Sequence, residues 1–309
     1  MAECKAAMTQ RNAYVPADAL ARAFAAGLAL LAIASVAGPA AASESAASGR
    51  GIDHNRELQA CLTLAERKPS EAFESALAWQ DRGGGDLARL CQALALFHKG
   101  DFKAAGARLE ELVPVLGKDD PKSAASLLAR AGWAWLRAGD QARAERLYGK
   151  ALERQPDDVD LHIDRAFARG EAERYWDAIA DLDAALARDP GRADAYLYRA
   201  GAHKALANDR QAIADVDRAL QLKPDDPDAI LLRGNIKAQI GNVAGARDDW
   251  QLVRRLAPDS SAARTAGINL DRSAKYQAQA PKANSRPDAK AGPDKSGPDQ
   301  SAAEKAPKP

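Results

Sequence analysis

The side chains that most often carry catalysis or bind metal ions form no known constellation in this chain of 309 residues. The four histidines, His54, His98, His162 and His203, are scattered, and the chain contains no CxxC pair, HExxH motif, phosphate-binding loop or nucleophile elbow. We therefore expect no catalytic residue, no metal and no cofactor. An enzyme whose site is assembled from scattered acidic residues is the remaining alternative, and a pocket with clustered, strongly shifted carboxylates would favour it.

Cysteine chemistry is possible at one pair of residues. Cys61 and Cys91 are the cysteines that follow residue 42, and an even number of cysteines in an exported protein permits a disulfide. Such a bridge would stabilise the fold by on the order of 3 kcal/mol, mainly by restricting the unfolded chain. Two buried free thiols are the alternative.

A repeat with a period of 34 residues determines where side chains lie along much of the chain. Five columns recur. The proline column is Pro156, Pro190, Pro224 and Pro258, the small column is Gly132, Ala166, Ala200 and Gly234, and the alanine column is Ala144, Ala178, Ala212 and Ala246. The large apolar column is Tyr148, Leu182, Val216 and Trp250, and the compact column is Ala151, Ala185, Ala219 and Val253. A fixed period of this length is typical of stacked supersecondary units. Small residues let two helices approach closely, large ones pack between units, and proline ends a helix.

The pattern resembles the tetratricopeptide repeat (TPR), a helix–turn–helix unit, most clearly from Tyr196 to Ala202. This resemblance implies an all-α fold, a right-handed superhelical solenoid of helix pairs with a concave face. The turns at Gly139 and Gly241 fit the family, because glycine readily adopts the left-handed conformation that ends a helix. Glu173 and Ala207 replace that glycine in two units, and the pattern does not define their turns.

One column departs from the family. The aromatic residue that follows the small residue by three positions is present as Trp135, but Arg169, His203 and Lys237 take its place in the later units. We expect looser packing at these three positions. Trp135 and Trp250 are expected to be core residues.

The repeat divides the chain into an irregular and a regular part. Residues 53–124 are assigned to two degenerate TPR-like repeats, followed by four regular repeats at 125–158, 159–192, 193–226 and 227–260. Residues 261–276 are expected to form a capping helix with a polar outer face. Residues 277–309 are rich in Pro, Lys and Ala and poor in apolar side chains, so we expect them to be disordered.

The N-terminal 42 residues have the layout of a secretory signal peptide, and residues 43–52 are a linker. Basic residues precede an apolar run from Ala23 to Ala37, and the small residues that end at Ala42 offer a cleavage site. The protein is therefore expected to be periplasmic or secreted, touching a membrane only while the signal is attached. An uncleaved membrane anchor is the alternative. Because the net charge is +1 and no basic stripe follows the repeats, we expect no binding to nucleic acid.

By the resemblance, the first helix of each unit lines the concave groove and contacts a partner. The residues expected there are Arg130, Trp133, Arg137, Asp160, Ile163, Asp164, Phe167, Asp194, Leu197, Tyr198, Lys204, Leu231, Leu232 and Asn235. Family members that grip a C-terminal carboxylate use Lys, Asn and Arg at such positions, whereas Ile163, Leu197 and Leu231 stand where those lysines would be. We therefore expect an apolar and possibly basic partner segment.

Together these features indicate a non-enzymatic adaptor or scaffold of the bacterial cell envelope that binds a protein or peptide segment in its groove. The bacterial origin is inferred from the signal layout and the composition, which is rich in alanine and arginine. A membrane-tethered structural or oligomerising TPR protein is the alternative.

Overall fold

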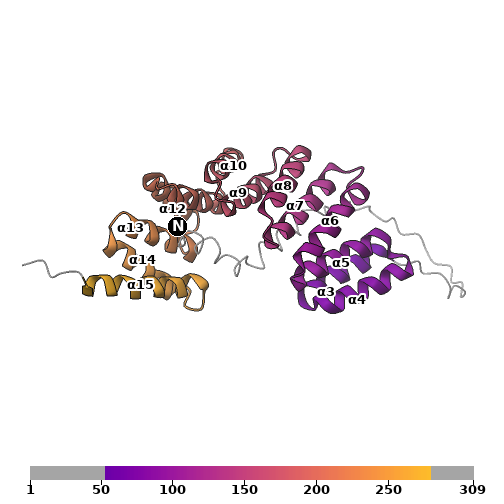
Figure 1. The fold of residues 1–309 in the computed structure, drawn as a ribbon, viewed down its shortest axis with the longest axis horizontal. Coiled ribbons are helices and arrows are strands. Elements are labelled where there is room, and N and C mark those ends of the chain that lie inside the picture. Colours follow the sequence, from indigo (N-terminus) through magenta and orange to yellow (C-terminus); the bar gives the residue numbers. More distant parts are fainter. Residues whose placement is uncertain (1–52, 280–309) are drawn as a thin grey trace, which may run out of the picture.

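Residues 53–279 are described by the structure of this protein, a computed structural model (Figure 1). The predicted signal peptide, the linker and the part of the predicted disordered tail beyond Gln279 lie outside the described residues. Within these bounds the chain is helical and has no strand. In chain order its helices are α3 (His54–Arg67), α4 (Pro69–Trp79), the π-helical turn η2 (Gln80–Gly84), α5 (Gly85–Lys99), α6 (Phe102–Leu116), α7 (Pro121–Arg137), α8 (Gln141–Arg154), α9 (Val159–Glu171), α10 (Tyr175–Arg188), α11 (Ala193–Ala205), α12 (Asp209–Leu222), α13 (Pro227–Gln239), α14 (Val243–Leu256) and α15 (Ser261–Gln279).

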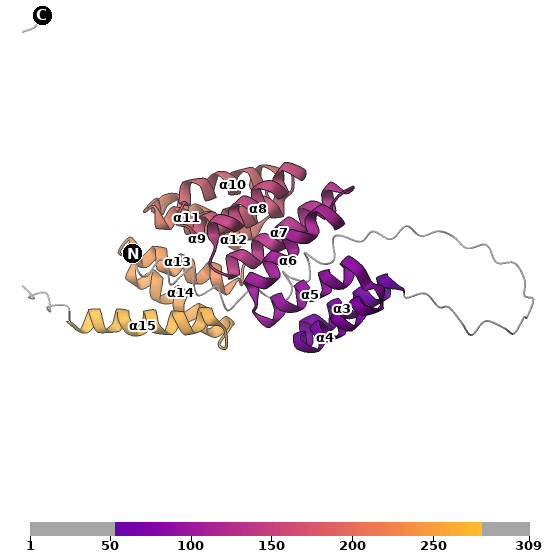
Figure 2. The same cartoon turned by 45° about the vertical axis from the view of Figure 1, so that its right-hand side comes forward.

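The helices pack in chain order as a curved stack of pairs, and we refer to the helices α3, α5, α7, α9, α11 and α13 as first helices. Each helix packs mainly against its neighbours in sequence, and α7, α9, α11, α13 and α15 also contact one another in order. Figures 1 and 2 show an arc that rises from α3 and α4 to α10 and descends to α15. Because elements come closest on the inner side of a curve, the first helices form that inner side. The predicted all-α solenoid of TPR-like helix pairs is confirmed.

Acidic caps and prolines set where the helices begin and end. Asp158 accepts a hydrogen bond from the Leu161 amide in the first turn of α9. α7 begins at Pro121, upstream of the predicted repeat boundary at residue 125, because Asp120 caps it and proline suits the first helical position. The second helices α8, α10, α12 and α14 each end just before the repeated proline, which cannot continue the hydrogen-bond ladder.

The small and large columns of the repeat meet in the core. A Cβ atom at Gly132 would lie 3.1 Å from the ring of Tyr148, and one at Gly234 would lie 2.8 Å from Nε1 of Trp250. The side chains of Tyr148 and Leu182 are 0% and 1% exposed. The close approach of the two helices in a unit therefore depends on the small column, as the pattern predicts.

The predicted core tryptophans are buried and hydrogen-bonded. Trp135 and Trp250 are 8% and 5% exposed. Their indole nitrogens donate to Glu110 at 2.6 Å and to Asn235 at 2.9 Å. Burial of a tryptophan is favourable when its N–H finds a partner, so these two residues combine packing with a satisfied donor.

The turns inside the units are alike, with or without glycine. Gly139 and Gly241 both have a φ of 84°, while Glu173 and Ala207 have a φ of 61° and 58°. In all four turns the next amide donates to the carbonyl five residues earlier, at 2.8–2.9 Å. Two non-glycine residues are therefore held in the left-handed conformation that this helix ending requires.

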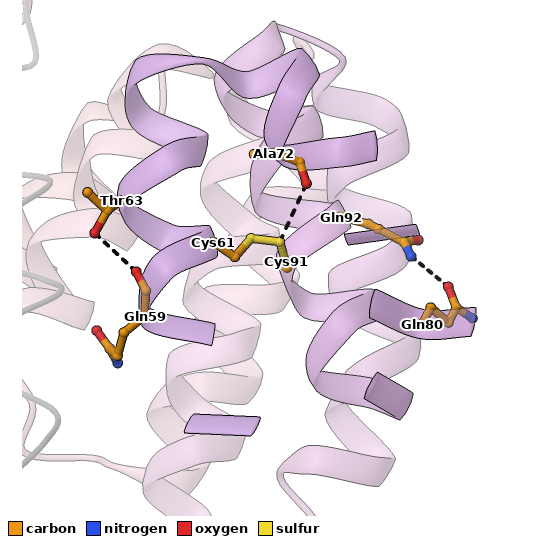
Figure 3. Close-up of a disulfide and its surroundings, with 7 residues drawn as sticks. All are labelled: Gln59, Cys61, Thr63, Ala72, Gln80, Cys91 and Gln92. Atoms are coloured by element: carbon orange, nitrogen blue, oxygen red, sulfur yellow. Dashed lines mark hydrogen bonds between the residues drawn. A yellow bond between two sulfur atoms is a disulfide. The ribbon is translucent and has the colours of Figure 1, made fainter. Parts of the chain in front are cut away.

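The N-terminal units carry a covalent link between their first helices. Cys61 of α3 and Cys91 of α5 form a disulfide with a Cα–Cα distance of 6.1 Å, which Figure 3 shows between the two helices. Both cysteines are buried, and the Cys91 sulfur also lies 3.8 Å from the carbonyl oxygen of Ala72. Trp79, which is 2% exposed, packs in the same cluster. The disulfide thus joins the least regular units of the array.

Candidate binding surface on the first helices

Three aromatic side chains from consecutive first helices form a row. The ring centre of Trp133 on α7 lies 6.0 Å from that of Phe167 on α9, and Phe167 lies 5.7 Å from Tyr198 on α11. All three side chains are only partly buried. We call Trp133, Phe167 and Tyr198 the aromatic row, and the structure brings together here three residues that were predicted from the sequence to share one face.

Arg192, which precedes α11, holds two of the acidic residues on this face. It donates to Asp160 at 2.6 Å and to the two carboxylate oxygens of Asp194 at 3.0 and 2.8 Å. Burial acts to raise the pKa of Asp194, but the hydrogen bonds and charge of Arg192 outweigh it and lower the pKa below its usual range. Asp160 and Asp194 therefore already share one cation. Arg192 was not predicted from the sequence, because no motif distinguishes this arginine from its neighbours.

In contrast to the lowered pKa of Asp194, the pKa of Asp164 on α9 is raised. Its side chain is partly buried. Burial raises the pKa of Asp164 to about 7, the charges of Asp160, Asp158 and Asp194 also act to raise it, and Arg192 opposes the rise. The folded protein therefore holds a proton on Asp164 more readily than water holds one on a solvated aspartate. A cation brought to this position would favour the ionised form.

The hydroxyl group of Tyr148 is directed toward the same region. Tyr148 lies on α8 with the end of its ring against Gly132 of α7, since a Cβ there would lie 3.1 Å from Cζ. Burial and the charge of Asp164 raise the pKa of Tyr148 well above its usual range, so the phenol remains protonated. Its hydroxyl oxygen is buried and has no hydrogen-bond partner within the described structure. The charge of Asp164 thus acts on a buried, unsatisfied hydroxyl group in the preceding unit.

Ile163 and Leu197, which the resemblance predicts on this surface, lie in the core instead. They are 5% and 7% exposed and pack within clusters of buried residues. Successive residues of an α-helix point about 100° apart. A helix that directs Asp164 and Phe167 toward the inner face therefore turns Ile163 toward the interior of the stack.

Asn235 and Arg137 are engaged inside the array. The side-chain oxygen of Asn235 accepts hydrogen bonds from Trp250 Nε1 and Asn269 Nδ2, both at 2.9 Å. The guanidinium of Arg137 lies 4.7 Å from the ring centre of Phe102. These contacts tie the predicted residues to the cap helix and to the preceding unit.

The other predicted residues are partly buried on first helices. Leu231 and Leu232 of α13 pack against the core cluster of the C-terminal units. Burial lowers the pKa of Arg130 on α7, and Lys204 lies near the end of α11. The aromatic row and Asp164 are therefore the part of the predicted set with the clearest potential for ligand contact.

Ion pairs that were not predicted from the sequence connect the two helices of three units. An arginine of the first helix donates two hydrogen bonds, at 2.6–3.0 Å, to an aspartate 16 residues later. The pairs are Arg165–Asp181, Arg199–Asp215 and Arg233–Asp249. The three aspartates are 4%, 7% and 4% exposed. Buried charges need such partners, so these residues bind the helices of a unit together.

The expectation of looser packing at the departing column is wrong. Arg169 donates to Asp181 at 2.7 Å, and Lys237 Nζ lies 2.8 Å from Asp249. His203 lies 3.9 Å from the buried aspartate of its own unit. Arg169 and Lys237 extend the ion pairs in place of an aromatic ring, whereas burial lowers the pKa of His203 and disfavours its charged form. The signal that could have revealed them is the recurrence of arginine and aspartate columns at the repeat period.

The described residues show neither a metal cluster nor a membrane span. Between residues 53 and 279, no three His, Cys, Asp or Glu side chains are grouped so that they could hold a metal ion. None of the helices in this range combines the length and the apolar character needed to cross a membrane. The interactions that the surface offers to a ligand are aromatic contact and carboxylate charge.

Comparisons with known proteins bear on the fold. No protein-family model matches the chain, and no curated protein sequence does. Among solved structures, TTC0263, described as a thermophilic TPR protein in Thermus thermophilus, is 17% identical over 62% of this chain and 100% of that chain, with a TM-score of 0.50.

Two further solved structures have lower TM-scores. MamA 41-end from Desulfovibrio magneticus RS-1 is 21% identical over 55% of this chain and 93% of that chain, with a TM-score of 0.48. The first TPR of Spaghetti (RPAP3), solved bound to the HSP90 peptide SRMEEVD, is 26% identical over 40% of this chain and 95% of that chain, with a TM-score of 0.38. These two likenesses are too loose to carry an argument. The similarity to TTC0263 shows that the described part of the chain has the helix-pair solenoid fold of a TPR protein.

Proposed function

We propose that this protein is an interaction adaptor that binds a segment of a partner protein across the aromatic row. The observation that carries this proposal is the contact of Trp133, Phe167 and Tyr198, three partly exposed rings on three consecutive first helices. Aromatic residues dominate the energetics of protein interfaces when they line a firm surface. Each ring here stands on a helix that packs against both neighbouring units, so little freedom is lost on binding.

The partner is a peptide or protein segment with an apolar side chain for the row. Three acidic residues, Asp160, Asp164 and Asp194, lie on the helices that carry Phe167 and Tyr198. An acidic or C-terminal carboxylate ligand would meet like charge there, which disfavours it. An apolar segment with basic residues matches both the rings and the charge.

The adaptor acts in the cell envelope after export. The layout of residues 1–42 supports this setting, because it contains an apolar run between Ala23 and Ala37. In this proposal the chain is cleaved near Ala42, and the apolar run is removed. N-terminal sequencing of the protein isolated from its cells tests this step. A mature chain beginning near residue 43 is expected, and retention of the apolar run would favour the membrane-tethered alternative.

Peptide selection tests the binding surface directly. We would select random 15-residue displayed peptides on the full chain and measure their affinity for three proteins: wild type, Trp133→Ala, and Trp176→Ala. Trp176 is the control, because it is 64% exposed at the start of α10, a second helix. Loss of Trp133 should weaken binding by about 2 kcal/mol, which is roughly 30-fold.

Trp176→Ala should leave these affinities unchanged. Circular dichroism would verify that Trp133→Ala retains the helical array, since Trp133 also packs against the N-terminal core cluster. Peptides that bind Trp133→Ala as tightly as wild type would contradict the proposal.

A further inference from the structure

Resting on the proposed function, we infer that the aromatic row recognises a lysine or arginine side chain of the partner, whose cation lies between the Asp164 carboxylate and the rings of Phe167 and Tyr198. This assigns Asp164 as the residue that selects the partner's charge, with the two rings as the walls around its cation. Aromatic faces attract cations, and the attraction grows when water is excluded.

The placement of Asp164 beside the rings follows from helix geometry. Asp164 and Phe167 are three residues apart on α9 and therefore share one face of that helix. Tyr198 reaches the same place from α11, with its ring centre 5.7 Å from that of Phe167. In the repeat, Tyr198 holds the position that Asp164 holds one unit earlier. Phe167 therefore adjoins both Asp164, which shares its face of α9, and Tyr198, which reaches its ring from α11.

The charge around Asp164 is deficient in cations. Asp158, Asp160 and Asp194 act on it as like charges, and Arg192 is the cation that opposes them. Arg192 is already committed, because it donates to both Asp160 and Asp194. The helix dipole favours an aspartate in the first turn of a helix. Asp164 lies beyond the first turn of α9 and does not gain this stabilisation. A cation from the partner would supply the charge that the protein itself does not.

The buried hydroxyl of Tyr148 is an independent observation that points to the same place. It is a donor without a partner in the described structure, and leaving a buried donor unsatisfied costs free energy. The charge of Asp164 acts on this hydroxyl group and helps to keep it protonated.

The raised pKa of Asp164 makes the proposed binding dependent on pH. The groups that act on it are Asp158 and Asp160 at the start of its own helix and Asp194 and Arg192 at the start of α11, and Asp164 in turn raises the pKa of Tyr148 on α8. From α7, Arg130 holds the equivalent repeat position. Because the pKa of Asp164 is about 7 in the free protein, a cation that requires the carboxylate binds more tightly as the pH rises.

The first experiment repeats the peptide selection on full-length Asp164→Asn, with Asp248→Asn as the matched control. Asp248 is exposed on the second helix α14. Peptides selected on the wild type and on Asp248→Asn should be enriched in a lysine or arginine next to an apolar residue. Asp164→Asn should lose this enrichment. Equal enrichment on Asp164→Asn would overturn the inference.

The second experiment measures one selected peptide at two pH values. Wild type should bind about 30-fold more tightly at pH 8 than at pH 5.5, the ratio of ionised fractions for a pKa of about 7. Replacing the peptide's basic residue by norleucine should remove this dependence, and that arm needs no variant of the protein. A pH-independent affinity for the basic peptide would overturn the inference.

The outcomes separate the two proposals. Peptides that need Trp133 but carry no basic residue, and that bind Asp164→Asn as well as wild type, would refute the cation site and leave the proposed function standing. Peptides that bind regardless of Trp133 would refute both. Peptides that need Trp133, Asp164 and their own basic residue support both.

Discussion

At the scale of single residues, ionising Asp164 in the folded protein costs free energy, because burial and nearby carboxylates raise its pKa to about 7. In the unfolded chain this pKa is about 3.9. As the pH rises between these values, the unfolded state loses its proton first and the free energy of unfolding falls. A residue that lowers stability in this way is commonly retained for function.

We therefore predict that Asp164→Asn is more stable than wild type at pH 8. The gain should be about 1–2 kcal/mol, less than the full value of about 1.36 kcal/mol per pKa unit because the side chain is partly exposed. Near pH 4 the two proteins should differ little. Urea unfolding at both pH values measures this, and a variant less stable than wild type at pH 8 would contradict the prediction.

The buried ion pairs give a second prediction at this scale. Asp249 is 4% exposed and accepts two hydrogen bonds from Arg233, with Lys237 Nζ at 2.8 Å. Asp249→Ala removes the carboxylate that two partly buried cations share, although Arg233 keeps Asp217 at 3.7 Å, and should lower the free energy of unfolding by about 3 kcal/mol.

The adjacent Asp248 is the control, because it is exposed on the same helix. Asp248→Ala should change the free energy of unfolding by no more than about 0.5 kcal/mol in the same urea titration. If the two variants unfold at the same urea concentration, the pairs do not stabilise the units as described.

At the scale of elements, the turns within the units permit a reciprocal test. Ala207 has a φ of 58°, a conformation that costs an alanine free energy and a glycine little. Ala207→Gly should therefore raise the free energy of unfolding by roughly 0.5–1 kcal/mol.

The reverse change belongs at Gly241, which has a φ of 84° and no heavy atom within 4 Å of the position that a Cβ would occupy. Gly241→Ala should cost about 1 kcal/mol, all of it conformational. Thermal unfolding of both variants measures the effects, and a loss of stability in Ala207→Gly would show that this turn is not under strain.

The repeat columns allowed the elements to be predicted but not their relative rotation. Prolines and small residues fall at constant spacing, and constant spacing in a solenoid means constant structure, so the helix pairs followed from the sequence alone. Two members of the aromatic row, Trp133 and Phe167, followed for the same reason because they share a column, whereas Tyr198 lies in the column of Asp164. Ile163 and Leu197 were misplaced because a rotation of one residue decides between surface and core.

The sequence alone did not predict which columns of the repeat contact each other. Arg199 and Asp215 recur with their units, but only the packing of α11 on α12 shows that the two columns face each other. The proximity of Tyr148 to Asp164 likewise depends on how α8 packs against α9. A single sequence shows which positions repeat, but the packing of the helices determines which of these positions are in contact.

At the scale of the whole molecule, each unit is stabilised mainly by its neighbours, so local changes should stay local. The disulfide between Cys61 and Cys91 closes a separation of 30 residues within the N-terminal units. Reducing it should lower their stability by on the order of 3 kcal/mol. Amide hydrogen exchange should accelerate in α3 and α5 and remain unchanged in α11–α14.

Alkylation provides the check on that prediction. If both cysteines react with iodoacetamide in the native, unreduced protein, the bridge is absent. If reduction accelerates exchange equally throughout residues 53–279, the array unfolds as one cooperative body and the picture of local stabilisation is wrong.

The most direct test of binding on the inner side of the arc is site-specific crosslinking of a selected peptide to the full chain. Benzoylphenylalanine would replace Phe167 on the first helix α9 in one protein and Trp176 on the second helix α10 in another. We predict that the peptide crosslinks from position 167 and not from position 176. Crosslinking from position 176 alone would contradict the proposed function, because the partner would then lie on the outer side of the arc.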